Sequence, residues 1–275
     1  MGRSLRIGGW ACLTLMGSVS GGAQAESLMV SGATYSQNFD TLVNTTGNTG
    51  STPADTPGTW TFVETSTNAN TFYTAGNGNS NAGDTYSYGT DNVSPTNSNR
   101  AIGMLRSANL ASTIGASFTN DIANSIITSL AIEYAGEQWR LGVARTPGTL
   151  DRIDFQYSLN ATALNDGTWT DVNALDFSTT TTLTVVGQKD GNQSTNRAIR
   201  ASTITGLNIA PGATFWIRWT DFDVSGVDDG LAVDDFFLTP TAEPVPVPIP
   251  LAAVGGLALF PFVIIGQARR RRNRE

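Results

Sequence analysis

The chain has 275 residues, no histidine and one cysteine, and its formal net charge is −7. Between Glu26 and Glu243 the acidic residues number 22 and the basic residues 9, which argues against nucleic-acid binding through phosphate neutralisation. Without histidine there is no Ser-His-Asp triad, Cys-His pair or His-ligated zinc. Lys189 is the only lysine, which removes most lysine-based catalysis.

The N-terminus has the layout of a secretory signal peptide. Two arginines precede an apolar run over residues 7–19, and the small residues "AQA" follow. This order predicts cleavage after Ala25. The alternative is a transmembrane anchor, but the run is shorter than the roughly 20 residues that a span needs. Because Cys12 lies inside the signal, the mature protein is expected to have no disulfide.

The first half of the body shows strand patterns separated by long polar stretches. A strand is predicted at 35–42, and a second places Trp60, Phe62 and Glu64 on one face. Residues 66–99 are dense in Asn, Gly, Ser and Thr, which predicts surface loops that cross one short strand.

Strand patterns continue through the second half. One face of the next predicted strand carries Ile126, Thr128, Leu130, Ile132 and Tyr134. Further strands are predicted at 138–144, 152–159, 183–186, 204–209, 214–223 and 231–239. A helix over "TNDIANSIITSL" is the alternative for that segment, but its β-branched residues weaken it. The spacing of the strands and turns predicts an all-β fold, an antiparallel β-sandwich or jelly roll.

Three segments of the body resemble concanavalin-like and MAM-like jelly rolls. They are "YSQNFDTL", "IEYAGEQWR" and "WIRWTDFDVSGVDDGLAVDDFFL". The resemblance implies that the first and last strands pair, which would bring Phe39 near Phe236. Such families bind glycans or proteins, so the resemblance is carried over to the fold only.

An acidic run near the end of the body could present oxygen ligands to calcium. Its predicted ligands are Asp221, Asp223, Ser225, Asp228 and Asp229, with Gly226 at the turn. A helix-loop-helix calcium site is excluded because the twelfth position holds Ala232. The alternative is a polar hairpin turn with solvated carboxylates. Calcium is the only cofactor that the sequence predicts.

A pair of adjacent carboxylates lies within the last predicted strand. Alternation sends either Asp234 or Asp235 inward, and a buried carboxylate needs a donor or a cation. We expect a structural ion pair with Arg140 or Arg218, each of which lies in a strand next to tryptophan.

Two further patterns bear on carbohydrate chemistry. Glu133 and Glu137 are the only close glutamate pair, and a jelly-roll glycosidase that used them is the alternative function. Laminarinase-like enzymes have the spacing E-x-D-x-x-E, and the position of its Asp holds Ala135. Loop aromatics suggest a glycan site, with packing against the core as the alternative. These aromatics are Tyr73, Tyr86, Tyr88 and Trp169.

The C-terminus combines a proline-rich motif, an apolar run and an arginine cluster. The motif is Val245, Pro246, Val247 and Pro248, and the cluster contains Arg269, Arg270, Arg271 and Arg272. The run at 249–266 extends to about 22 residues if counted from Val245, long enough for a membrane helix. The arginines predict a cytoplasmic end. An ordinary C-terminal anchor is the alternative to a sorting signal.

In this order the three features resemble the PEP-CTERM and VPLPA-CTERM sorting signals of bacteria. The resemblance implies recognition by an exosortase-type membrane protease and delivery to the cell surface or to an exopolysaccharide matrix. The sequence thus divides into a signal peptide at 1–25, a sandwich ectodomain at 26–243 and a sorting tail at 244–275. We expect an exported structural or adhesive protein whose partners are the secretion translocon, the sorting protease and extracellular polysaccharide.

Overall fold

The computed structural model describes residues 25–44, 51–90, 99–146 and 148–246. Within these residues the structure contains strands and two short 3₁₀ helices, η1 (Pro53–Asp55) and η2 (Asn173–Leu175), and no α-helix. The strands form two sheets, which we call sheet A and sheet B.

Sheet A has seven strands. They are β1 (Glu26–Leu28), β3 (Trp60–Thr65), β7 (Ala111–Asn120), β9 (Arg152–Ser158), β10 (Thr170–Asp171), β11 (Phe177–Ser178) and β14 (Thr214–Asp221). At its centre β14 pairs antiparallel with both β7 and β9. The short β1 pairs parallel with β7.

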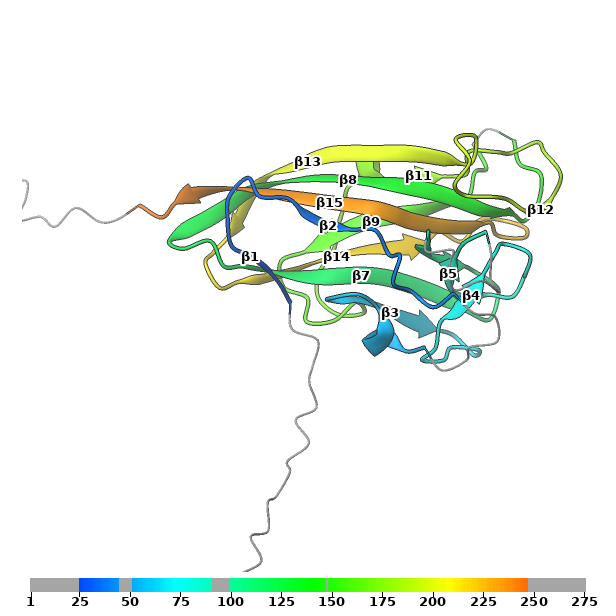
Figure 1. The fold of residues 1–275 in the computed structure, drawn as a ribbon, viewed down its shortest axis with the longest axis horizontal. Helices are drawn as coiled ribbons and strands as arrows, with labels where there is room; N and C mark the ends of the chain where they lie inside the picture. The colour runs from blue at the N-terminus through cyan, green and yellow to red at the C-terminus, as the bar shows by residue number, and fades with distance from the viewer. Residues whose placement is uncertain (1–24, 45–50, 91–98, 147, 247–275) are drawn as a thin grey trace, which may run out of the picture.

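Sheet B has eight strands. They are β2 (Tyr35–Gln37), β4 (Thr74–Gly76), β5 (Asp84–Tyr88), β6 (Ala101–Leu105), β8 (Ser125–Leu141), β12 (Gly187–Gln188), β13 (Arg197–Ile209) and β15 (Gly230–Pro244). The long strands β13, β8 and β15 lie side by side, and β2 lies on the other side of β15 (Figure 1).

The two sheets face each other across one aromatic core, which confirms the predicted β-sandwich. Trp219 of sheet A packs edge-to-face against Tyr134 and Phe236 of sheet B, with ring centroids 5.2 Å and 5.9 Å apart. Trp60 stacks on Trp219 at 5.7 Å. Edge-to-face and offset ring pairs add to the stabilisation that burial of the rings supplies.

The strand predicted to open the sandwich, β2, pairs with the last strand, β15, as the jelly-roll resemblance implies, although the short β1 precedes it and pairs with β7. In β2 and β15, Gln37 lies opposite Phe236. Phe39 follows β2 with a left-handed backbone (φ 56°). The rings of Phe39 and Phe236 both pack edge-to-face on Trp60, at 4.6 Å and 5.2 Å.

A β-bulge in β15 reverses which face its side chains occupy. Asp234 pairs with Ala135 of β8 and Phe237 with Glu133, so β15 takes one residue more than β8 across this step. Asp235 sits in the left-handed region (φ 44°). Since alternation has a period of two, one extra residue flips every later side chain. Phe236 therefore faces the core and Phe237 faces solvent.

A second bulge explains an error in the predicted face of β8. On the β15 side, consecutive residues pair with Ser129 and Ile127, so Thr128 has no partner there. On the β13 side, residues 206–208 lie between the partners of the same two residues. The flip buries Ile127 and leaves Ile126 partly exposed, where the sequence predicted Ile126 and Thr128 inside. The inward positions predicted from Leu130 to Tyr134 are confirmed.

Three other predictions about strands differ in how well they agree with the structure. Trp60, Phe62 and Glu64 are all buried, as predicted. The strand predicted at 183–186 is wrong, because pairing with β8 begins only at Gly187. The described part of the segment at 66–99 contains two strands, β4 and β5, rather than one.

The predicted signal peptide and most of the predicted sorting tail lie outside the described residues. Of the sorting motif, Val245 and Pro246 are described; the Val245 N–H donates to the carbonyl of Asn124 (2.8 Å). Among the described residues the structure contains no helix long and apolar enough to cross a membrane.

Candidate functional site

A row of side chains crosses the outer face of sheet B, one from each of four neighbouring strands. Phe237 of β15 lies between Ser36 of β2 and Glu133 of β8. Glu133 in turn lies opposite Ala201 of β13. Opposed side chains on one face of a sheet are about 5 Å apart, so the row forms one continuous surface. The Phe237 side chain at its centre is 39% exposed.

Small hydroxyl side chains surround this row. The next row contains Thr34, Thr239, Ala131 and Thr203, and the third contains Thr241, Ser129 and Thr205. The Thr34 and Thr239 hydroxyls are hydrogen-bonded at 2.7 Å. An open hollow of about 560 Å³ lies over the first two rows. A second hollow of about 340 Å³ lies between Phe237, β2 and Asp235.

An ionic cluster lies beside the bulge, on the same outer face of sheet B as Glu133. The Arg197 guanidinium of β13 forms an ion pair with Asp235, and it lies 3.9 Å from Asp234 and 3.5 Å from Oε1 of Glu137. Asp234 and Glu137 are buried. Asp234 is therefore the buried aspartate of the pair. Because it adjoins Val233, whose side chain lies in the core, its own side chain lies on the outer face of sheet B, so the expectation that it turns inward is wrong.

The predicted partners of this aspartate pair are wrong. Arg140 instead donates to the carbonyls of Gly78 and Asn79 (3.1 and 3.0 Å). Arg218 lies in sheet A, where it stacks over Trp169 at 3.9 Å and donates to Gln156 (2.7 Å). The sequence did not identify Arg197 because its approach to β15 depends on β13 and β15 flanking β8.

Burial dominates the electrostatics of this cluster. It raises the pKa of Glu137 to about 7 and that of Asp234 to about 8, while the positive charge of Arg197 opposes both shifts. In an unfolded chain both carboxyls have a pKa of about 4. The folded protein therefore binds more protons, and the stability that these groups contribute at acid pH is lost as pH rises through 7 and 8.

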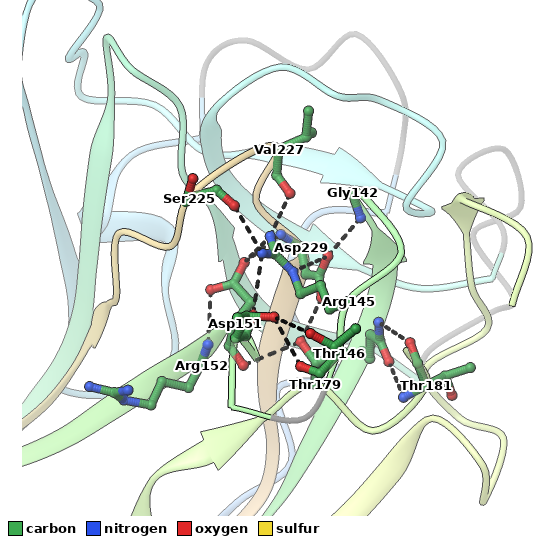
Figure 2. Close-up of polar contacts among 12 residues, drawn as sticks. Gly142, Arg145, Thr146, Asp151, Arg152, Thr179, Thr181, Ser225, Val227 and Asp229 are labelled. Carbon is green, nitrogen blue, oxygen red and sulfur yellow. Dashed lines mark hydrogen bonds and ion pairs between the residues drawn. The ribbon is translucent and has the colours of Figure 1, made fainter. Parts of the chain in front are cut away.

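The loop predicted to bind calcium surrounds a buried arginine (Figure 2). Arg145 donates to the carbonyl oxygens of Ser225 (3.3 Å) and Val227 (2.6 Å). It also lies 3.7 Å from carboxylate oxygens of both Asp151 and Asp229. A guanidinium from the same chain thus supplies positive charge to this loop.

Protein donors satisfy two of the carboxylates around Arg145. Asp229 accepts hydrogen bonds from the N–H of Gly142 (2.6 Å) and the hydroxyl of Thr179 (2.5 Å). Asp151 accepts one from the N–H of Asp229 (2.6 Å). Asp151, Arg145 and Thr179 come from other parts of the chain, so the loop sequence alone did not reveal this network.

The remaining predicted calcium ligands are divided between surface and interior. Asp223 is exposed and pairs with Arg106 at 3.3 Å. Asp221 is buried, and neither of its carboxylate oxygens accepts a well-formed hydrogen bond; the same holds for Oδ1 of Asp228. Burial and the charges of Asp151 and Asp228 raise the pKa of Asp221 well above its usual range, while Arg106 opposes the rise.

Calcium binding therefore stays a prediction, now centred on Asp221 and Asp228. In the part of the chain that the structure describes, no three acidic, histidine or cysteine side chains are arranged to hold a metal. A site here would need backbone carbonyls or a small movement of the loop.

The structure does not bring Glu133 and Glu137 together as a catalytic pair. They lie four residues apart along β8, a separation of about 13 Å between their backbones, and the paired carboxyls of glycosidases are about 5–10 Å apart. Glu133 is exposed, but Glu137 is buried against Trp139, whose indole N–H donates to it (3.0 Å).

The loop aromatics are mostly core residues. Tyr73, Tyr86 and Tyr88 are buried, so the expectation that they form an exposed glycan site is wrong. Tyr88 stacks between Tyr86 and Trp139 at 4.9 and 5.7 Å. Only Trp169 of this set stays partly exposed.

No family model and no curated protein sequence matches the chain. Among solved structures it is similar to the CBM22-1 xylan-binding domain of Paenibacillus barcinonensis Xyn10C, with 9% identity and a TM-score of 0.34 over 77% of this chain and 96% of that one. It is also similar to a family 35 carbohydrate-binding module of Clostridium thermocellum, with 12% identity and a TM-score of 0.27 over 68% and 94%.

A third similar structure is the enzymatically active domain of bacteriophage CBA120 tailspike protein 4. The identity is 12% and the TM-score 0.34 over 72% of this chain and 21% of that one. Similarities this distant carry no function over to the chain.

Replacing Arg197 by leucine should destabilise the protein more at pH 8 than at pH 5. The loss of its charge leaves Glu137 and Asp234 buried without a cation, and at pH 8 we expect about 2–4 kcal/mol of lost unfolding free energy. At pH 5 both carboxyls hold protons and the loss should be smaller. Urea unfolding followed by tryptophan fluorescence measures both values.

The control for this test is Arg140→Leu, which removes an arginine that donates only to backbone carbonyls in this region. It should cost about 1 kcal/mol with little dependence on pH. Equal losses for the two variants at both pH values would show that the cluster does not depend on Arg197.

If calcium binds at Asp221, a saturating concentration should raise the melting temperature of the wild type by about 5–10 °C. Asp221→Asn should abolish this response, whereas Asp223→Asn should keep it because Asp223 lies at the surface with Arg106. Differential scanning calorimetry with calcium and with a chelator measures the shifts.

A different result is expected if no calcium binds at Asp221. Without a bound cation, burial and the neighbouring charges of Asp151 and Asp228 raise the pKa of Asp221 and favour its protonated form, so Asp221→Asn should change the stability little at about pH 6. A wild type whose melting temperature does not respond to calcium, together with an Asp221→Asn variant of unchanged stability, would exclude the calcium site.

Proposed function

We propose that this protein is an exported, surface- or matrix-sorted β-sandwich of the jelly-roll type that binds extracellular polysaccharide without cleaving it. The binding surface is the outer face of sheet B around Phe237. The observation that carries this proposal is the bulge at Asp235, which turns a phenylalanine ring outward at the centre of a four-strand face of hydroxyl side chains.

The chemistry of this face suits a sugar polymer. The exposed Phe237 ring offers a flat apolar surface, and the threonine and serine hydroxyls both donate and accept hydrogen bonds. A small number of polar groups that converge on an apolar side chain is typical of sites for small molecules and sugars. The hollow is open rather than enclosed, so a long polysaccharide can bind across the strands at any point along its length.

Export and sorting support the same role. The predicted signal peptide and the tail that resembles a PEP-CTERM or VPLPA-CTERM signal would deliver the sandwich to the outer side of the cell. Along this route the chain would meet the translocon first, then an exosortase-type protease, and finally the polysaccharide of the surface or matrix.

The Phe237→Ala variant should lose binding to insoluble polysaccharide at least tenfold, a change of about 1.4 kcal/mol in binding free energy. The measurement is a pull-down of the full chain in detergent with cellulose, xylan and chitin. Phe222→Ala is the matched control, because Phe222 is exposed to a similar extent (38%) but lies directly after β14 of sheet A.

Two results would count against the proposal. Unchanged binding in the Phe237→Ala variant would move the site away from sheet B. Release of new reducing ends from any of these polymers would favour the alternative, a glycosidase-like secreted enzyme.

The mature protein should begin at Glu26 and lack the arginine cluster when it is expressed in a bacterium with an exosortase-type protease. Replacing Arg269, Arg270, Arg271 and Arg272 by glutamine should leave the tail attached. Intact-mass spectrometry of the surface fraction tests both points. An unprocessed chain that accumulates in the cytosol would contradict the predicted route.

A further inference from the structure

Glu133 is the acidic side chain at the centre of the hollow on sheet B. It is an exposed residue of β8, and it lies opposite Phe237 of β15 on one side and Ala201 of β13 on the other. The other lining residues of the hollow are uncharged, most of them Thr, Ser or Ala. A single carboxylate therefore stands on a surface that otherwise offers hydroxyls and an aromatic ring.

Glu133 differs from the other acidic residue at this surface. Asp235, at the far side of Phe237, is neutralised by Arg197. Among the contacts of the described residues, no hydrogen bond or ion pair involves the side chain of Glu133. Its charge is thus available to a ligand, and no arginine or lysine lines the hollow.

The charge of the whole body acts in the same direction. With 22 acidic and 9 basic residues between Glu26 and Glu243, the surface attracts cations and repels polymers that carry carboxylate, sulfate or phosphate groups. A cation held at Glu133 also lies beside the Phe237 ring, where the ring face attracts positive charge. One carboxylate cannot enclose a metal ion, so a ligand with its own cationic group fits better.

We infer that the polysaccharide bound at this site is an amino sugar polymer with free, protonated amines. The Glu133 carboxylate accepts hydrogen bonds from the ammonium group, and the Phe237 ring packs against the face of the sugar. This inference rests on the proposed function, since it names the class of glycan that the same surface selects.

Chitosan and chitin test the inference, because they share one backbone and differ in whether the amine is free or acetylated. At about pH 6, below the usual pKa of an amine, the wild-type full chain in detergent should bind chitosan at least tenfold more tightly than chitin. Glu133→Gln should remove most of this preference and leave chitin binding unchanged. Phe237→Ala should weaken binding to both polymers.

General attraction between an acidic protein and a cationic polymer needs its own control. Glu243→Gln removes the same charge from an exposed position of the same strand as Phe237, six residues away and about 20 Å along the strand. It should change neither affinity by more than about twofold. An equal loss in Glu243→Gln and Glu133→Gln would reduce the effect to net charge and overturn the inference.

The remaining outcomes separate this inference from the proposed function. Equal binding of chitin and chitosan, or binding of cellulose or xylan alone, would overturn the amino sugar assignment and leave polysaccharide binding standing. Failure to bind any of the four polymers would overturn both.

Discussion

The one-residue bulge at Asp234–Asp235 is the constraint on which the outer face of sheet B depends. Without the extra residue, the strand that buries Leu231 and Val233 would also bury Phe237 and turn Phe236 to solvent. A left-handed aspartate costs backbone energy, and the ion pair between Asp235 and Arg197 offsets this cost. The arrangement of the proposed binding face and the ion pairs of the neighbouring carboxylates are therefore linked at one position.

Two arginines perform equivalent tasks at different places in the sandwich. Arg197 neutralises carboxylates beside the bulge, and Arg145 neutralises Asp151 and Asp229 next to the loop that precedes β15. Both bring charge from one strand or loop to carboxylates on another, so each ties distant parts of the chain together. A body this acidic needs such internal cations because several of its carboxylates are buried. Glu133 remains exposed without one, and this is the basis for the cationic ligand that we propose there.

Local patterning predicted the strands well where the ladder is regular. The alternation in 60–64 and from Leu130 to Tyr134 identified buried side chains correctly. It failed at Thr128, where a bulge reverses which side chains face the core. It also failed at 183–186, where the apolar residues do not form a strand. Of the candidate site, the aspartate pair and the acidic loop were visible in the sequence. Their arginine partners were not, because strand order decides which side chains meet.

Composition and local periodicity were enough to establish the class of fold, the acidic character of the body, and the lack of any histidine and of all lysines but Lys189. The sequence also supplied the predicted signal peptide and sorting tail, which lie outside the described residues. Only the tertiary structure decided that Phe237 rather than Phe236 faces solvent, that Arg197 and Arg145 are the internal cations, and that Glu133 stands exposed in a hollow. The physical reason is that bulges and strand order set the register between distant segments, and register decides which side chains share a face.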